Sequence, residues 1–255
     1  MDRASEEPPP FVPGPGGMRW EVRTLATGLE APWALAILPG GEALISQRGG
    51  RLWRRSADGA LRPVSGVPAP VAGGQGGLLD VLALPEAVGI RVALSLAARR
   101  PNGTIATAVV VGRLMGTDLR EVWPLLHAFP GAEEGGVHFA GRLAADGGDG
   151  LFVAPGDLGV REWPQAPGAT AGRILRVGWD RSPRGGGAWR VGDPVAWSMG
   201  HRNLDYNPNK GNHGLRSASG PGFPMVLPER RRCQPNRREI GPAGRSPPAQ
   251  PLFGL

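Results

Sequence analysis

From Val22 onward the chain alternates short apolar runs with clusters of glycine, proline, aspartate and asparagine. Brief runs of Val, Leu, Ile and Ala are typical of strands, and the clusters between them are typical of hairpin turns. These runs lack the roughly 3.6-residue spacing of an amphipathic helix over any useful length. The pattern therefore predicts an all-β protein.

A similar unit recurs along the chain: an apolar strand, a glycine-rich turn and a second strand with a polar end. Four stretches follow this plan, namely AILPGGEALISQR, LALPEAVGIRVALSLA, LAADGGDGLFVAPGD and DYNPNKGNHGLRSAS. Measured from Leu38, Leu84, Ala145 and Tyr206, they are 46, 61 and 61 residues apart. This spacing is typical of β-propeller blades joined by loops of variable length.

In the second unit, the following stretch TIATAVVVGRL predicts a third strand of the same blade. We therefore expect an incomplete β-propeller of about three to four blades. An open arc of this kind leaves one face of each terminal blade uncovered.

The pattern divides the chain into three segments. Residues 1–17 contain acidic residues and several prolines, and they predict a disordered leader rather than an export signal. Residues 18–211 predict the partial propeller. From residue 204 onward 9 of 52 residues are proline, too many for central strands, so residues 212–255 predict a disordered Pro/Arg-rich tail. No apolar run reaches the roughly 18 residues of a membrane-spanning helix.

The formal charge of +7 is concentrated near the end of the sequence. Residues 1–203 carry 21 basic and 19 acidic side chains, whereas residues 204–255 carry 8 and 3. This distribution, without interleaved aromatic residues, argues against a nucleic-acid partner. A basic nucleic-acid binder that relies on the tail stays as a third hypothesis. The single cysteine, Cys233, excludes an internal disulfide and a cysteine zinc site.

Gln75 and His138 are the first candidates for chemistry. Gln75 lies between two pairs of glycines in GGQGGLLD, where the backbone can approach a ligand closely and the amide can hydrogen-bond a planar polar molecule. An interblade turn with an exposed glutamine is the alternative. His138 precedes a predicted strand and could act as a general base near neutral pH, or as a hydrogen-bonded structural histidine.

Four further polar residues have two interpretations each. Asp157 and Asp80 could each orient a neighbour or close a turn. Arg202 and Asn203 end the segment GHRN, and a guanidinium beside an amide suits carboxylates or quinone oxygens. A surface arginine is the alternative for Arg202, and His127, on an apolar stretch, is favoured as structural.

Four segments in fixed order carry a resemblance: GLEAPWALAILP, VAGGQGGLLDV, HFAGRL, and AGRILRV followed by GHRN. Over about Leu25 to Asn203 they resemble the soluble aldose sugar dehydrogenases of the glucose/sorbosone dehydrogenase family, which depend on pyrroloquinoline quinone. The resemblance implies a six-bladed β-propeller that oxidises the anomeric hydroxyl of aldose sugars with hydride transfer to the quinone. It also implies bound calcium, an unidentified electron acceptor and a periplasmic or secreted location.

The same resemblance assigns roles to matching residues. His138 stands at the place of the catalytic base, and Gln75 at that of a glutamine that contacts the cofactor. Counting back from the segment AGRILRV places a second such glutamine at Gln165. Arg202 and Asn203 match an Arg-Asn pair that lies against the quinone.

The sequence departs from the family after about residue 204. The family's acidic HGPRGGDE-like segment near the calcium site, and the downstream basic residues that neutralise the cofactor's carboxylates, have no counterpart here. We therefore expect a chain cut short or shifted out of frame near residues 204–215, with impaired activity and without the calcium ligands. The alternative is a non-catalytic propeller fragment that acts as a binding module.

Overall fold

The computed structural model describes residues 11–13, 19–21, 24–85, 89–133, 136–148, 150–178 and 195–203. Within these ranges the regular elements are strands, apart from the short 3-10 helices Pro39–Gly41 and Trp163–Gln165. No helix among the described residues is long and apolar enough to cross a membrane. The predicted all-β class is confirmed.

Three four-stranded antiparallel sheets form the body of the structure, and in each the strands are neighbours in chain order. The first blade contains β3 (Pro32–Ile37), β4 (Ala43–Gln47), β5 (Leu52–Arg55) and β6 (Leu61–Pro63). The second contains β7 (Leu78–Pro85), β8 (Ile90–Arg99), β9 (Ile105–Met115) and β10 (Asp118–His127). The third contains β11 (Ala140–Ala145), β12 (Gly150–Pro155), β13 (Arg173–Gly178) and β14 (Val195–Met199).

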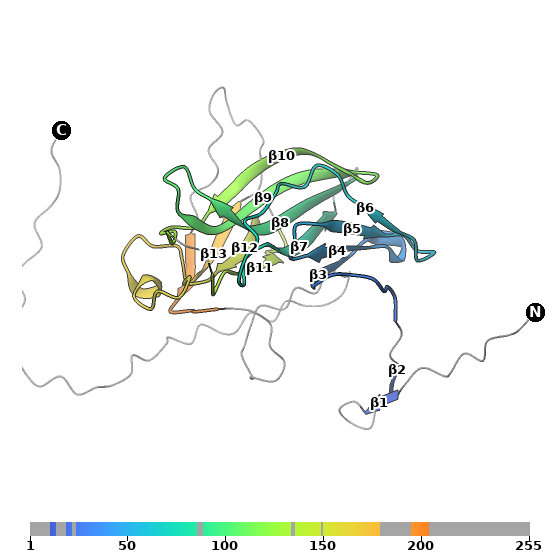
Figure 1. Cartoon of the computed structure of the whole chain (residues 1–255), viewed down its shortest axis with the longest axis horizontal. Coiled ribbons are helices and arrows are strands. Elements are labelled where there is room, and N and C mark those ends of the chain that lie inside the picture. The colour runs from blue at the N-terminus through green and yellow to red at the C-terminus, as the bar shows by residue number, and fades with distance from the viewer. Residues whose placement is uncertain are drawn as a thin grey trace, which may run out of the picture.

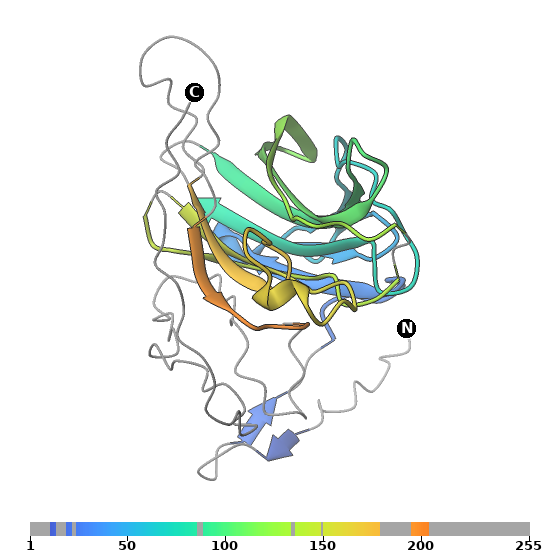
Figure 2. The same cartoon turned by 90° about the vertical axis from the view of Figure 1, so that its left-hand side faces the viewer.

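The blades follow one another along an arc, with the second blade between the other two (Figure 1). Figure 2, turned by 90°, shows β14 in orange at the edge of the third sheet. Simple up-and-down sheets of this kind are the blades of a propeller, so the predicted partial β-propeller is confirmed. The first three repeated units are the inner hairpins of the three blades, and the fourth lies outside the described residues.

The predicted third strand of the second blade is β9, which pairs with β8 over its length. A separate two-stranded ribbon joins β1 (Phe11–Pro13) and β2 (Arg19–Glu21). Of the leader expected at residues 1–17 the structure describes only β1, and the tail at 212–255 lies outside the described residues. The segment boundaries therefore stay predictions.

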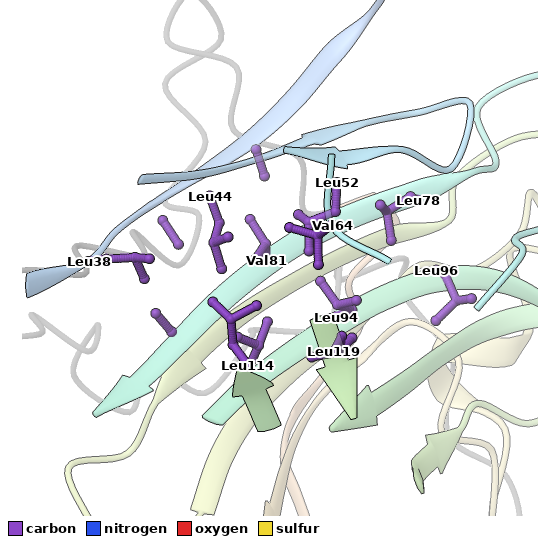
Figure 3. Close-up of a cluster of buried hydrophobic side chains, with 14 of the residues drawn as sticks. Leu38, Leu44, Leu52, Val64, Leu78, Val81, Leu94, Leu96, Leu114 and Leu119 are labelled. Atoms are coloured by element: carbon purple, nitrogen blue, oxygen red, sulfur yellow. The ribbon is translucent and has the colours of Figure 1, made fainter. Parts of the chain in front are cut away.

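The first two blades pack through a shared apolar core. Along β3 the side chains alternate, so that Ala34 and Ala36 are buried while Leu35 and Ile37 remain 50% and 47% exposed. Figure 3 shows the buried side, where leucines of the first blade meet leucines and valines of the second. Each fully buried leucine contributes about 1.5–3 kcal/mol relative to an exposed one. The outward Leu35 and Ile37 fit the uncovered face expected of a terminal blade.

The second and third blades pack in the same way. The larger members of this cluster are Leu82, Leu84, Val109, Val111, Trp123, Leu125, Leu126, Leu143, Leu151, Val153, Leu175 and Val177. Most of their strands contribute alternate residues to the interface, as the two-residue period of a strand requires, whereas β10 contributes the consecutive Leu125 and Leu126 at a register shift. This packing holds β11 against β7.

Asp80 on β7 ties the second blade to the third through a buried carboxylate. It is 2% exposed and accepts hydrogen bonds from the backbone nitrogens of Val81 (2.9 Å) and Leu143 (2.8 Å). Nη1 of Arg142 lies 3.4 Å from the same carboxylate. Of its two predicted roles, Asp80 thus orients a neighbour. Burial raises the pKa of Asp80, against the opposing effect of Arg142 and the two backbone donors.

This raised pKa predicts a pH-dependent stability difference between the protein and its Asp80→Asn variant. A carboxyl group whose folded-state pKa exceeds the ordinary 3.8 stabilises the fold most below that value and loses the contribution as pH rises through the folded pKa. Asparagine does not titrate, so the free energy of unfolding should shift in the variant's favour as pH rises. Urea unfolding of both proteins from about pH 4 to about pH 8 measures this shift, and a constant difference would contradict the raised pKa.

Candidate functional site

The candidate site forms where the loops that precede the inner strands of the second and third blades meet. Gln75 lies just before β7, and His138 lies just before β11. Oε1 of Gln75 accepts a hydrogen bond from the backbone nitrogen of His138 at 2.7 Å. The backbone nitrogen of Gln75 donates to the carbonyl oxygen of Gly136, also at 2.7 Å. The two loops are therefore joined by a reciprocal pair of hydrogen bonds.

The glycine before Gln75 is required by this close approach. Gly74 has a φ of +53°, and a Cβ added to it would lie 2.2 Å from the carbonyl oxygen of Gly136. A side chain at this position would force the two loops apart. The glycines around Gln75 thus serve the contact between two loops, and they leave the amide of Gln75 at the junction.

His138 has an unusual backbone conformation. Its φ is +55°, a left-handed value that is uncommon outside glycine and costs on the order of 1–3 kcal/mol. The conformation is held on both sides, because the His138 nitrogen donates to Gln75 and its carbonyl accepts from Leu158 at 3.3 Å. Gly156 packs so closely on this carbonyl that an added Cβ would lie only 1.6 Å from the oxygen.

Asp157 orients the imidazole of His138. Its Oδ1 lies 2.8 Å from Nδ1 of His138, and its Oδ2 accepts from Nε of Arg202 at 3.1 Å. The Asp157 side chain is completely buried, whereas those of His138 and Arg202 are 25% and 51% exposed. Oδ1 also accepts from the backbone nitrogen of Gly159 at 2.9 Å. Asp157 therefore fills both predicted roles, because it closes a turn and orients a neighbour.

The contact with Asp157 also determines which nitrogen of His138 accepts a proton. An ionised carboxylate only accepts hydrogen bonds, so Nδ1 of His138 carries the hydrogen that points to Oδ1. In the neutral ring the lone pair then lies on Nε2, on the side away from Asp157. The arrangement presents a proton acceptor on a partly exposed ring.

The GHRN segment is anchored beside this pair. The backbone nitrogen of Asp157 donates to the carbonyl oxygen of Arg202 at 2.8 Å, and that of His201 donates to Gly172 at 2.9 Å. Oγ of Ser198 lies 2.7 Å from Nε2 of His201, and burial lowers the pKa of His201. These contacts give His201 a structural role, because they anchor the segment that carries Arg202 and Asn203 at the end of the third blade.

The structure brings His138 and Arg202 together through Asp157, and Gln75 joins this cluster through its hydrogen bond to the His138 backbone. Gln165 belongs to the neighbouring segment: it ends the helix Trp163–Gln165, and its Nε2 lies 3.0 Å from the place of a Cβ on Gly200. Asn203 follows Arg202 directly. The sequence leaves the role of Asp157 open, and no motif in the segment between His138 and Asp157 signals the contact of their side chains.

Two other expectations concern histidine and metal. His127 ends β10, and burial lowers its pKa, which fits a structural histidine.

Across the described ranges, no group of three or more His, Cys, Asp or Glu side chains could hold a metal ion. The Asp157 oxygens are already occupied by N–H donors, and calcium stays a prediction from the resemblance alone.

Comparison with known proteins gives consistent matches over this region. The family model described as glucose/sorbosone dehydrogenase matches residues 29–212. Aldose sugar dehydrogenase YliI of Escherichia coli is 39% identical over 165 residues, which cover 61% of this chain and 43% of the relative.

Solved structures agree with the sequence matches. A crystal structure of glucose dehydrogenase has a TM-score of 0.61 and 37% identity, covering 71% of this chain and 55% of that one. The PQQ-bound form of aldose sugar dehydrogenase from Streptomyces coelicolor has a TM-score of 0.58 and 28% identity, covering 71% and 54%. The chain spans about half the length of the relatives it matches.

The close packing of Gly156 on His138 predicts that Gly156→Ala destabilises the fold. Because the new Cβ would overlap the His138 carbonyl oxygen, the backbone must shift, at a cost of about 1–3 kcal/mol or more. Gly148→Ala is the matched control, since its Cβ would meet Asp146 at an ordinary 3.7 Å. Urea unfolding compares the two variants, and equal stability would refute the close approach.

Proposed function

This chain belongs to the glucose/sorbosone dehydrogenase family, and on that premise we propose that it oxidises the anomeric hydroxyl of an aldose sugar with pyrroloquinoline quinone as the hydride acceptor. The observation that carries the proposal is the His138–Asp157–Arg202 cluster beside Gln75. It supplies a base with a fixed proton-accepting nitrogen, a cation and an amide in one place.

The residues of this cluster fit part of the proposed cofactor, which is a planar quinone with three carboxylates, because the cluster supplies one cation, Arg202. Arg202 keeps a half-exposed guanidinium on the Asp157 carboxylate that also contacts His138, and a guanidinium pairs well with carboxylate or quinone oxygens. Oε1 of Gln75 accepts a hydrogen bond from the His138 backbone. The side-chain nitrogen of Gln75 would therefore be the atom that donates to an oxygen of the cofactor. We assign cofactor contacts to Gln75, Arg202 and Asn203, and to Gln165 from the adjacent segment.

The bound quinone would supply a two-electron acceptor for the hydride that leaves C1 of the sugar. Nε2 of His138 takes the proton of the anomeric hydroxyl, which leaves the sugar as a lactone. Asp157 stabilises the resulting imidazolium through Nδ1–H, as the carboxylate of a catalytic triad does. Because the His138 ring is partly exposed, it can return the proton to solvent. Reoxidation of the cofactor requires an external electron acceptor.

His138→Ala should separate binding from turnover. The variant lacks the proton acceptor but retains Gln75 and Arg202, so it should bind pyrroloquinoline quinone while sugar-dependent reduction falls by about 10²–10⁴-fold. Spectroscopic titration measures binding, and stopped-flow absorbance measures reduction. Val137→Ala, at the preceding residue, is the control for changes in the loop.

Three outcomes bear on the proposal. Full turnover in His138→Ala would remove His138 from the role of base. Cofactor binding without sugar oxidation in the unaltered chain would favour a non-catalytic binding module. Absence of cofactor binding in that chain would refute the function itself.

Asp157→Asn should impair the same step for a different reason. The asparagine amide can donate to Nδ1, which reverses the tautomer and places the hydrogen on Nε2, where it blocks proton acceptance. In a catalytic triad the corresponding change lowers the rate by up to about 10⁴-fold. Stopped-flow reduction across pH tests this, and an Asp157→Asn variant with unaltered rates would show that the contact is only structural.

A further inference from the structure

Arg48 reaches from the first blade to the loop that carries Gln75. It follows β4, and its side chain donates a hydrogen bond to the carbonyl oxygen of Gly74. Its guanidinium carbon lies 5.4 Å from the centre of the Trp33 ring, within the range of a cation–π contact. The Arg48 carbonyl accepts from the backbone nitrogen of Leu78, the first residue of β7, at 3.0 Å.

The contacts of Arg48 continue to His138. Gly74 precedes Gln75, and Gln75 Oε1 holds the backbone nitrogen of His138. Trp33 packs against the apolar cluster that contains Phe139, the residue after His138. Arg48 is thus linked to the His138 backbone through the Gly74–Gln75 loop, and to the cluster that contains Phe139 through the Trp33 ring.

We propose that Arg48 is a positioning residue of this site: its guanidinium holds the Gly74–Gln75 loop so that Gln75 remains bonded to the His138 backbone. His138 depends on this restraint because its φ is left-handed, and such a conformation persists only when neighbouring contacts maintain it. Its bearing on catalysis rests on the proposed function, but the contacts themselves exist without a ligand.

This role differs from a general contribution to stability. If Arg48 acts on His138 through Gln75, removal of Gln75 should make Arg48 irrelevant to His138. Two residues that merely stabilise the fold would instead have additive effects. A double-mutant cycle therefore distinguishes positioning from bulk stabilisation.

The test is amide hydrogen exchange of the ligand-free full chain, followed by NMR at His138. Gln75→Ala should raise the exchange rate of this amide by about tenfold, because it removes the hydrogen-bond acceptor. Arg48→Ala should change it in the same direction, and the double variant should match Gln75→Ala alone. Exchange at the buried Val153 amide reports global stability for comparison.

Two variants serve as matched controls. Arg48→Lys keeps the charge and part of the reach, so it should restore much of the protection. Arg51→Ala removes an exposed arginine three residues further on and should leave the His138 amide unchanged. Unchanged exchange in Arg48→Ala, or an additive double variant, would overturn the proposal.

A parallel titration with pyrroloquinoline quinone separates this inference from the proposed function. Arg48→Ala and Gln75→Ala should each weaken binding, again without additivity in the double variant. If the unaltered chain fails to bind the quinone while the exchange results hold, the positioning role stands and the function fails. If the unaltered chain binds the quinone but exchange does not respond to Arg48, the positioning role fails, and sugar oxidation by the unaltered chain decides the function separately.

Discussion

A fully buried carboxylate requires hydrogen-bond donors, because the free-energy cost of burying an unpaired charge is far larger than the stabilisation from one ordinary contact. In this protein that carboxylate is Asp157, and its donors come from three separate places along the chain: His138, Gly159 and Arg202. The need to satisfy it brings the loop before β11, the turn after β12 and the end of the third blade together. The imidazole orientation and the place of the guanidinium both follow from this requirement.

The stacking of blades supplies the surroundings in which such a carboxylate can be buried. Each sheet has to cover its apolar face with a neighbouring sheet, and β7 lies between the first and third blades. The ends of inner strands then come together at one side of the arc. The loops pack so closely there that only small residues fit. This explains why glycines flank Gln75 and why Gly156 packs against the His138 carbonyl.

The elements that could be predicted from sequence are those set by local pattern. Strand alternation and glycine-rich turns indicate the hairpins of all three blades, because both signals lie within about a dozen residues. The bond from His138 to Gln75 joins residues 63 positions apart and depends on how closely two backbones approach. Asp157 has the sequence signature of a turn residue, and its second bond to His138 is visible only in the fold. Arg48 carries no motif at all, since its importance comes from the loop it reaches.

The site divides its tasks between two kinds of bond. On one side, Gln75 holds the backbone of His138 through a neutral hydrogen bond, which sets the position of the residue but leaves its ring unaffected. On the other side, Asp157 contacts the ring through a charge-assisted bond, which is stronger and selects the tautomer. The position of His138 and the tautomer of its ring are therefore controlled by different residues on different blades. A change at Gln75 should alter where the base stands, whereas a change at Asp157 should alter whether it can accept a proton, even though both residues contact the same histidine.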